Sequence, residues 1–331
     1  MKKIINDPNL VVQDMLKGLV SAYPNSFKQV PNTTVIVRKD APATGKVGLV
    51  SGGGSGHEPA HAGYVGKGML DAAVCGEVFT SPTPDQVYEA IKAVDGGAGV
   101  FLIIKNYTGD VMNFEMAAEL AQADGIEVEQ VIVNDDVAVE DSSFTTGRRG
   151  IAGTIFVHKI AGAKAEAGGS LQDVKTIAEK VVANVRSMGM ALSPCTVPAA
   201  GKPSFELADN EMEVGMGIHG EPGTERKAIT TADEIATELT QKILDDMHLS
   251  NGDEVAVMVN GLGSTPEMEL YIVNGKVNDI LKEKGINIYK TFVGEYMTSL
   301  EMAGCSVTLL KLDDELKELL NAESQAPAFR N

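Results

Sequence analysis

The sequence predicts an α/β fold, built as two α/β domains with mostly parallel or mixed central sheets. Short apolar runs that end in glycine-rich turns recur along the chain, and amphipathic segments of helical length separate them. The length of 331 residues favours about two domains. Apolar residues at 44% and charged residues at 22% are typical of a globular chain with sizeable cores.

Three apolar runs in the first half predict strands. They are residues 46–50, before SGGGSGHEP, residues 99–105, before NYTGD, and residues 128–133. Helices are expected near residues 112–123 and from Thr83-Pro84-Asp85-Gln86, where a threonine N-cap precedes a proline and glutamine is at N3. This order of strand, turn and helix is typical of a largely parallel sheet.

A connection between the two domains is predicted near the middle of the chain. A long helix is expected over residues 171–188, and the prolines and glycine of SPCTVPAAGKPSFEL then mark residues 193–207 as a segment without regular structure. We therefore divide the chain into domains 1–190 and 191–331.

The second half restarts the α/β pattern. A capping box at Thr231 and Glu234 opens a helix. Apolar runs predict strands at residues 211–218, 254–260 and 306–312, and the first two lead into the turns HGEPG and GLGSTP.

Charge and cysteine content exclude several classes of protein. A formal net charge of -18 would repel a phosphate backbone, so we predict no nucleic-acid partner. No apolar run reaches the roughly 18–20 residues of a membrane span, and no signal-peptide pattern follows the N-terminal lysines, which predicts a cytoplasmic protein without a membrane partner. The three cysteines are far apart in the sequence, which favours buried free thiols.

The glycine run from Ser51 to His57 (SGGGSGH) follows a predicted strand. Glycines allow a close approach of the backbone to an oxygen-rich ligand. The run is not a P-loop, because no Gly-Lys-Ser/Thr closes it. A plain loop is the alternative interpretation.

The segment His57-Glu58-Pro59-Ala60-His61 matches the H-E-x-x-H pattern of zinc proteases. That pattern requires both histidines on one helix face, and proline is tolerated only in the first turn of a helix. His57 would then precede the helix. A zinc hydrolase is therefore a disfavoured alternative, and we predict no metal site.

Lys105 ends one predicted strand, and Asp110 begins the helix after it. Ligands of open α/β sheets bind at the carboxyl ends of strands, where His57, Lys105 and Asp110 would converge. Taken separately, Asp110 could be an N-cap and Lys105 a solvated strand end.

His219 lies between Gly217 and Gly220 in the turn GIHGEPG, where a histidine is accessible and held by a tight turn. A hydrogen-bonded turn histidine is the alternative. We interpret His158 and His248 as structural, and the acidic stretch 134–141 as a solvated loop that pairs with Arg148 or Arg149.

Five long motifs resemble the substrate-binding subunits of bacterial dihydroxyacetone kinases, the DhaK family. The motifs are SGGGSGHEPAHAGYVGKGMLDAAVCGEVFTSPTPDQ, IIKNYTGDVMNFEMA, DDVAVEDSSFTTGRRGIAGT, GIHGEPG and MVNGLGSTP, and the resemblance covers essentially the whole chain. It implies a two-domain subunit that forms a homodimer. It also implies that His219 binds the carbonyl carbon of dihydroxyacetone as a hemiaminal.

The resemblance further implies the other members of the site. His57 and Asp110 are the candidates for the catalytic base, and the choice between them stays open. The remaining substrate-binding positions are Gly54, Ser55, Gly56 and Lys105. Because glycerol has no carbonyl group, a covalent bond of this kind would reject it sharply.

The resemblance implies that the phosphoryl donor is on another protein. The chain carries no P-loop or kinase catalytic loop, and it ends at Asn331 without the helical nucleotide-binding domain of ATP-dependent family members. The implied partners are a DhaL-like kinase subunit that holds ADP or ATP with magnesium and, indirectly, a DhaM-like phosphocarrier of the phosphotransferase system. No cofactor is expected on this chain.

A dihydroxyacetone-sensing paralogue that activates a transcription regulator is the alternative function. A sensor needs His219 to capture the ligand but needs no base. The presence of both His57 and Asp110 favours the kinase subunit.

Overall fold

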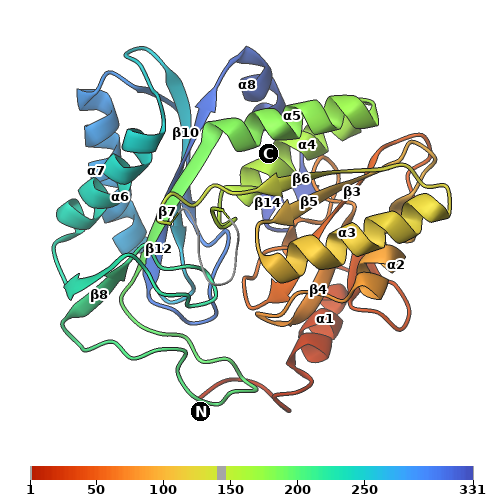
Figure 1. Cartoon of the computed structure of the whole chain (residues 1–331), viewed down its shortest axis with the longest axis horizontal. Coiled ribbons are helices and arrows are strands. Elements are labelled where there is room, and N and C mark those ends of the chain that lie inside the picture. The colour runs from red at the N-terminus through yellow and green to blue at the C-terminus, as the bar shows by residue number, and fades with distance from the viewer. Residues whose placement is uncertain (1, 140–146, 331) are drawn as a thin grey trace.

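The computed structural model describes residues 2–139 and 147–330. Two six-stranded sheets lie side by side with helices against their faces (Figure 1). The α/β fold class predicted from the sequence is confirmed. Cys75, Cys195 and Cys305 are buried free thiols, as predicted.

The first sheet has the strand order β1-β2-β4-β3-β5-β6. Strands β3 to β6 pair in parallel, whereas β1 and β2 add an antiparallel edge. Its strands are β1 (Phe27–Gln29), β2 (Val35–Arg38), β3 (Gly48–Ser55), β4 (Ala72–Val78), β5 (Val100–Lys105) and β6 (Val128–Val133).

Helices cover both faces of the first sheet. Alternate residues of its central strands point to opposite sides, so each face buries its own set of side chains. In β5, Leu102 and Ile104 pack with α2 (Pro84–Val94) and α3 (Thr108–Ala123), while Phe101 and Ile103 pack toward α4 (Thr154–Glu166). The other helices of this half are α1 (Val11–Ala22), the short 3-10 helix η1 (Ala62–Tyr64) and α5 (Leu171–Asn184).

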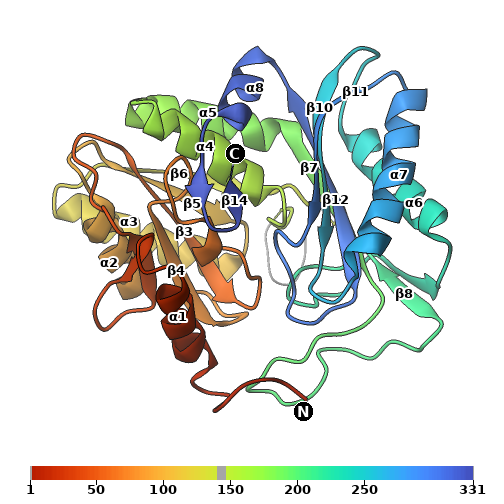
Figure 2. The same cartoon turned by 180° about the vertical axis from the view of Figure 1, so that it is seen from behind.

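The second sheet has the order β11-β10-β12-β7-β8-β9, and only the pair β10–β11 is parallel. Helices α6 (Ala232–Asp246) and α7 (Glu267–Glu283) cover its outer face (Figure 2). Its strands are β7 (Val185–Ala191), β8 (Glu211–Val214), β9 (Glu225–Ala228), β10 (Glu254–Gly261), β11 (Asn287–Gly294) and β12 (Gly304–Leu312).

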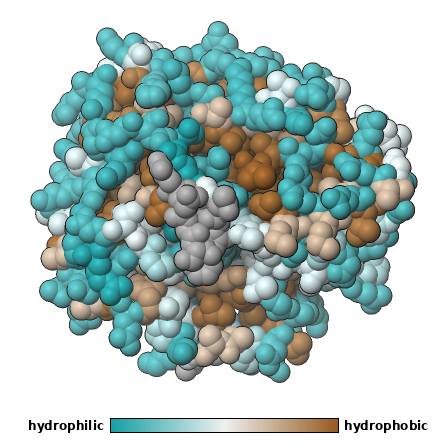
Figure 3. Space-filling model, viewed as in Figure 1, coloured by the Kyte–Doolittle hydropathy of each residue, from teal (hydrophilic) through white to brown (hydrophobic). Residues whose placement is uncertain are grey.

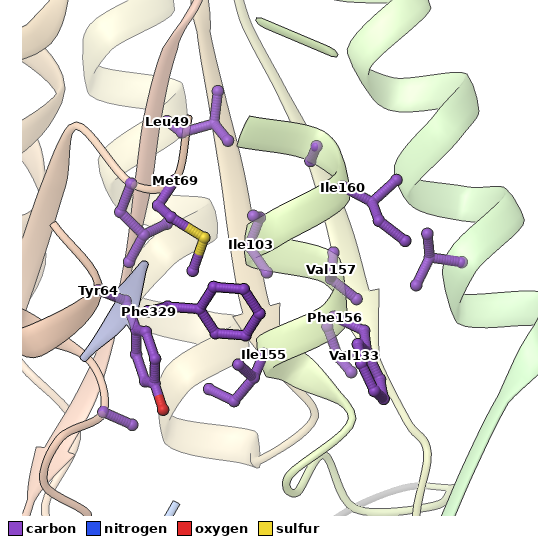
Figure 4. Close-up of a cluster of buried hydrophobic side chains, with 14 of the residues drawn as sticks. Leu49, Tyr64, Met69, Ile103, Val133, Ile155, Phe156, Val157, Ile160 and Phe329 are labelled. Carbon is purple, nitrogen blue, oxygen red and sulfur yellow. The ribbon is translucent and has the colours of Figure 1, made fainter. Parts of the chain in front are cut away.

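One apolar core joins the two halves. It contains residues of both sheets, of α4 and α5, and of α8 (Asp314–Asn321) near the end of the chain. The small hairpin of β13 (Gln325–Ala326) and β14 (Phe329–Arg330) contributes Phe329, whose ring lies near Tyr64 and Ile155 (Figure 4). The division into domains 1–190 and 191–331 remains a prediction.

Three local predictions were wrong. Residues 185–188 do not extend the helix at 171–188 but begin β7, because β12 supplies hydrogen-bond partners that helical periodicity cannot reveal. The glycine run is not a loop after a strand, since Ser51 to Ser55 complete β3. The strand predicted at 211–218 ends at Val214, where the chain turns toward His219.

Candidate functional site

An open pocket of about 710 Å³ lies between the first sheet and the loop that follows β8. The segment between β7 and β8 supplies Ser204 and Phe205 to its lining. The other lining residues are Gly54, Phe79, Ser81, Tyr107, Thr108, Gly109, Asp110, His219, Gly220, Glu221 and Pro222.

Glycines in β3 make room for charged residues on the side of the pocket formed by the first sheet and the start of α3, which we call the first wall. A Cβ atom at Gly53 would collide with Lys105 Nζ, and one at Gly54 would collide with the backbone of Phe79 and Thr80. The glycine run is therefore required by close packing inside a strand and at the pocket wall.

Lys105 lies at the carboxyl end of β5 and is fully buried rather than solvated. Its Nζ atom is 3.1 Å from Gly52 O, 2.9 Å from His61 Nε2 and 3.6 Å from Asp110 Oδ2. Burial lowers the pKa of Lys105, and the neighbouring Asp110 carboxylate opposes that effect.

Asp110 is not an N-cap, because α3 begins at Thr108 with Tyr107 at the N-cap. Its side chain is buried in the first turn. Oδ2 faces Lys105, and Oδ1 has no hydrogen-bond partner within the described part of the chain. A buried carboxylate oxygen that faces a pocket and lacks a partner is available to a ligand hydroxyl.

His57 follows β3 after Gly56 and is fully buried. Its Nδ1 lies 2.8 Å from the carbonyl oxygen of Thr298, which can only accept, so Nδ1 carries the proton. Burial, followed by the charges of His219 and Lys105, lowers the pKa of His57 well below its ordinary value. The ring is therefore neutral near pH 7, and Nε2 keeps its lone pair without a partner in residues 2–139 and 147–330.

The His219 ring packs directly against the His57 ring in a T-shaped contact, with the ring centroids 4.8 Å apart. Its Nδ1 donates to Glu221 Oε1 at 2.8 Å, and its backbone N donates to Glu221 Oε2 at 2.9 Å. The Tyr107 and Phe79 rings make T-shaped contacts with it, with ring centroids 4.6 and 5.3 Å away. Because Nδ1 donates to the carboxylate, the tautomer with the proton on Nδ1 presents the Nε2 lone pair as a nucleophile.

A chain of buried charges continues behind Glu221. Arg149 donates from Nη2 to Gly215 O at 2.7 Å and from Nε to Asp136 Oδ2 at 2.8 Å. Burial opposes the ionisation of Glu221, but His219 and Arg149 lower its pKa to about 2. Burial raises the pKa of Asp136 to about 6, although Arg149 acts in the opposite direction.

The acidic stretch is therefore not a solvated loop, since Asp135 and Asp136 are fully buried. The predicted pairing with Arg149 is confirmed. Arg148 pairs with Asp246 at the end of α6. Asp141 lies outside the described residues.

Four predicted substrate-binding positions do not line the pocket, namely Ser55, Gly56, His57 and Lys105. His57 and Lys105 still contact lining residues, since the His57 ring stacks on Phe79 and Lys105 faces Asp110. Ser55 Oγ donates to Gly76 O at 2.7 Å, and the backbone N of Gly56 donates to the carboxylate of Glu58. Among the predicted residues, the structure brings together Gly54, His57, Lys105, Asp110 and His219.

Sequence reasoning assigned no role to Phe79, Tyr107 or Glu221. Glu221 lies in the HGEPG turn beside a predicted nucleophile, so the motif carried a signal for it. The two aromatic residues gave none, because only the tertiary structure places their rings against His219.

The zinc hydrolase alternative lacks the helix it requires. His57 precedes the 3-10 helix η1, which begins only at Ala62, and His61 Nε2 contacts Lys105. No group of three potential metal-ligating side chains occurs within residues 2–139 and 147–330. In the same part of the chain, no helix is long and apolar enough to cross a membrane.

His158 is fully buried in α4, and both of its ring nitrogens lack a partner among the residues described. His248 is exposed after the end of α6. Neither histidine reaches the pocket.

The family described as the Dak1 domain matches residues 17–328. The chain is 62% identical to the dihydroxyacetone-binding subunit DhaK of PTS-dependent dihydroxyacetone kinase 1 from Listeria innocua, over 95% of both chains. It is 47% identical to the corresponding subunit of the PEP-dependent kinase from Escherichia coli, over 99% of both.

Solved structures agree with these relationships. The native dihydroxyacetone kinase of C. freundii superposes with a TM-score of 0.92 at 38% identity, over 99% of this chain and 60% of that one. The dihydroxyacetone kinase operon co-activator Dha-DhaQ superposes with a TM-score of 0.89 at 39% identity, over 95% of this chain and 97% of that one.

Proposed function

From the premise that the chain belongs to the Dak1 domain family, we propose that it is the dihydroxyacetone-binding subunit of a phosphotransferase-system-dependent dihydroxyacetone kinase. It captures dihydroxyacetone covalently on His219 and presents a hydroxyl group to a phosphoryl donor on a partner subunit. The observation that carries this proposal is the geometry of His219. Its ring lies in the pocket wall with Nδ1 bonded to Glu221, which leaves Nε2 as a nucleophile.

Covalent capture explains how so small a substrate is recognised. Nε2 of the neutral imidazole adds to the carbonyl carbon of dihydroxyacetone and forms a hemiaminal. Glycerol has the same hydroxyl groups but no carbonyl, so it is held only by hydrogen bonds. Gly54, Lys105 and Asp110 line or border the same pocket and are suited to bind those hydroxyl groups.

Two groups are candidates to accept the proton of the phosphorylated hydroxyl. Asp110 offers Oδ1 from the pocket lining, and His57 offers Nε2 from a neutral ring. Phosphoryl transfer also needs positioning and charge neutralisation, which the partner's nucleotide and magnesium would supply. The related C. freundii kinase has been solved with AMP-PNP and Mg²⁺.

The partner must cover the mouth of the pocket, because the transferred phosphoryl group has to reach the substrate in line. Helix α3 begins at that mouth with Thr108 and Gly109, and its outer side carries Met112, Met116 and Leu120 at four-residue spacing, each at least half exposed. Figure 3 shows apolar patches among hydrophilic residues on the face where α3 lies. We assign this α3 ridge (Met112, Met116, Leu120) to docking of the nucleotide-bearing subunit.

A coupled assay for dihydroxyacetone phosphate tests the function. The chain alone with dihydroxyacetone, magnesium and ATP should make no product, and addition of a DhaL-like subunit charged by a DhaM-like phosphocarrier should start turnover. Turnover by the chain alone would contradict the proposal. Light scattering on the purified chain tests the predicted homodimer.

The similarity to the co-activator Dha-DhaQ supports a second candidate, a dihydroxyacetone sensor for a transcription regulator. Identities of 62% and 56% to dihydroxyacetone-binding subunits, against 39% to the co-activator, favour the kinase subunit. A chain that forms the adduct but gives no product with any charged kinase subunit would reverse this choice.

A further inference from the structure

Glu221 binds His219 at two points. One carboxylate oxygen accepts from the ring Nδ1 and the other from the backbone N of the same residue. A bidentate contact of this kind fixes both the orientation of the ring and its tautomer. Glu221 is itself 6% exposed, so water competes little for these bonds.

Arg149 holds this carboxylate in a charged state. The guanidinium is fully buried and anchored by Asp136 and by Gly215 O. Its remaining nitrogen, Nη1, has no hydrogen-bond partner within residues 2–139 and 147–330. A Cβ atom at Gly217 would collide with Glu221 Oε2 and would lie 2.8 Å from Arg149 Nη1, so the glycine keeps the space between the two groups open.

Tyr107 also contacts the imidazole. Its ring makes a T-shaped contact with the His219 ring, with the centroids 4.6 Å apart, and its side chain is buried. The imidazole is therefore held both by an aromatic contact and by a carboxylate, which limits its rotation. Its Nε2 edge is left toward the pocket that Asp110 and Gly54 also line.

We propose that Glu221, beside the buried positive charge of Arg149, is the positioning residue of the nucleophile and stabilises the positive charge that His219 acquires when the hemiaminal forms. This inference rests on the proposed function, because it concerns the same covalent step. It adds an electrostatic role that the candidate bases His57 and Asp110 do not supply.

The step balances as an addition without a leaving group. The lone pair of Nε2 forms the bond to the carbonyl carbon, and the π pair of the carbonyl moves to its oxygen, which takes a proton from solvent. Nδ1 keeps its proton, so the ring becomes a cation. The ionised carboxylate of Glu221 lies 2.8 Å from that Nδ1 and stabilises the adduct more than the free ring.

Two substitutions separate charge from shape. Glu221→Gln keeps the size of the side chain and one acceptor but removes the charge, whereas Glu221→Asp keeps the charge on a shorter side chain. We expect adduct affinity to fall roughly 10- to 100-fold in Glu221→Gln, the range given by a lost charged hydrogen bond. The adduct affinity of Glu221→Asp should lie between that of Glu221→Gln and that of the wild type.

The adduct is measured by intact-protein mass spectrometry after titration with dihydroxyacetone, with thermal melting to confirm folding. Selective ¹⁵N labelling of histidine reports the His219 tautomer, assigned by comparison with His219→Ala. In Glu221→Gln the Nδ1–H tautomer should persist while affinity falls. If Glu221 had a purely structural role, the order of adduct affinities would be reversed, and the shorter Glu221→Asp side chain would bind dihydroxyacetone more weakly than Glu221→Gln.

Glu213→Gln is the matched control. Glu213 is also 6% exposed and bonds Gly223 N in the same turn, but it does not contact His219. This variant should bind dihydroxyacetone as the wild type does. Adduct affinity in Glu221→Gln within about twofold of the wild type, or Glu221→Asp no better than Glu221→Gln, would overturn the inference. A wild-type chain that forms no adduct would instead reject the proposed function, and this inference with it.

Discussion

The pocket lies between the first wall and a second wall, which is the turn that follows β8. Each wall has a histidine near a Glu-Pro pair in the sequence, but the two histidines have different hydrogen-bond partners. On the first wall, His57 is fully buried and donates from Nδ1 to the main-chain carbonyl of Thr298. On the second wall, the His219 side chain is 19% exposed and donates from Nδ1 to the Glu221 carboxylate. Both rings keep a proton on Nδ1, so the difference lies in the charge of the acceptor.

One additional residue between the histidine and the glutamate of the second motif produces this difference. In GHEP the glutamate directly follows the histidine, and Glu58 accepts from the backbone of Gly56 rather than from the ring. In HGEP a glycine intervenes, and Glu221 reaches the ring of His219. A neutral acceptor suits a base that stays uncharged, whereas a carboxylate suits a nucleophile that becomes cationic.

The largest effect is expected from a substitution at His219. We expect His219→Ala to abolish covalent capture, because no other ring nitrogen in the pocket lining has a carboxylate partner. Intact-protein mass with and without dihydroxyacetone measures the loss. Discrimination against glycerol should weaken in parallel, and an adduct of unchanged yield would refute the assignment.

The first wall is tested by Asp110→Asn and His57→Asn. The variant that removes the base should lose roughly 10²- to 10⁴-fold in turnover with the charged partner and still form the adduct. The other should lose mainly substrate affinity. Measuring kcat, KM and adduct yield for both variants identifies the base, and a full-rate Asp110→Asn enzyme beside an inactive His57→Asn enzyme would assign the role to His57.

Only the first wall continues into the exposed α3 ridge. A double substitution, Met112→Glu with Met116→Glu, should raise the KM for the partner subunit roughly 5- to 30-fold while adduct formation is unchanged. Met268→Glu on α7 is the control, since Met268 is 71% exposed on the outer side of the second sheet. An equal effect of both changes would remove the ridge from the docking surface.

The last prediction concerns stability and not activity, at the buried His158. Burial, assisted by Lys105, lowers its pKa to about 3, whereas an unfolded chain binds that proton near pH 6.5. Stability is therefore full above about pH 6.5 and falls as the pH decreases toward 3, by up to about 1.4 kcal/mol per pH unit at this position. His158→Leu should flatten that dependence in urea unfolding measured from pH 7 to 4, and an unchanged slope would show that His158 is protonated in the fold.

The fold class and several elements follow from local sequence. The apolar runs at β5 and β6 and the capping box of Thr231 were predictable, because periodicity and capping act within a few residues. The convergence of His57, Lys105 and Asp110 was also expected, since the carboxyl ends of parallel strands share one edge.

Contacts between residues that are distant in the sequence were decided by the tertiary structure, because local sequence patterns do not predict them. Pairing with β12 made residues 185–188 a strand and not a helix, and burial placed Asp136 on Arg149 instead of in solvent. The same long-range packing set Phe79 and Tyr107 against His219 and directed Ser55 away from the pocket. Sequence alone determined which residue types stand at the ends of the strands. Packing between the two halves determined which of these residues come into contact. The reason is that desolvation and hydrogen-bond geometry depend on neighbours that only the folded chain supplies.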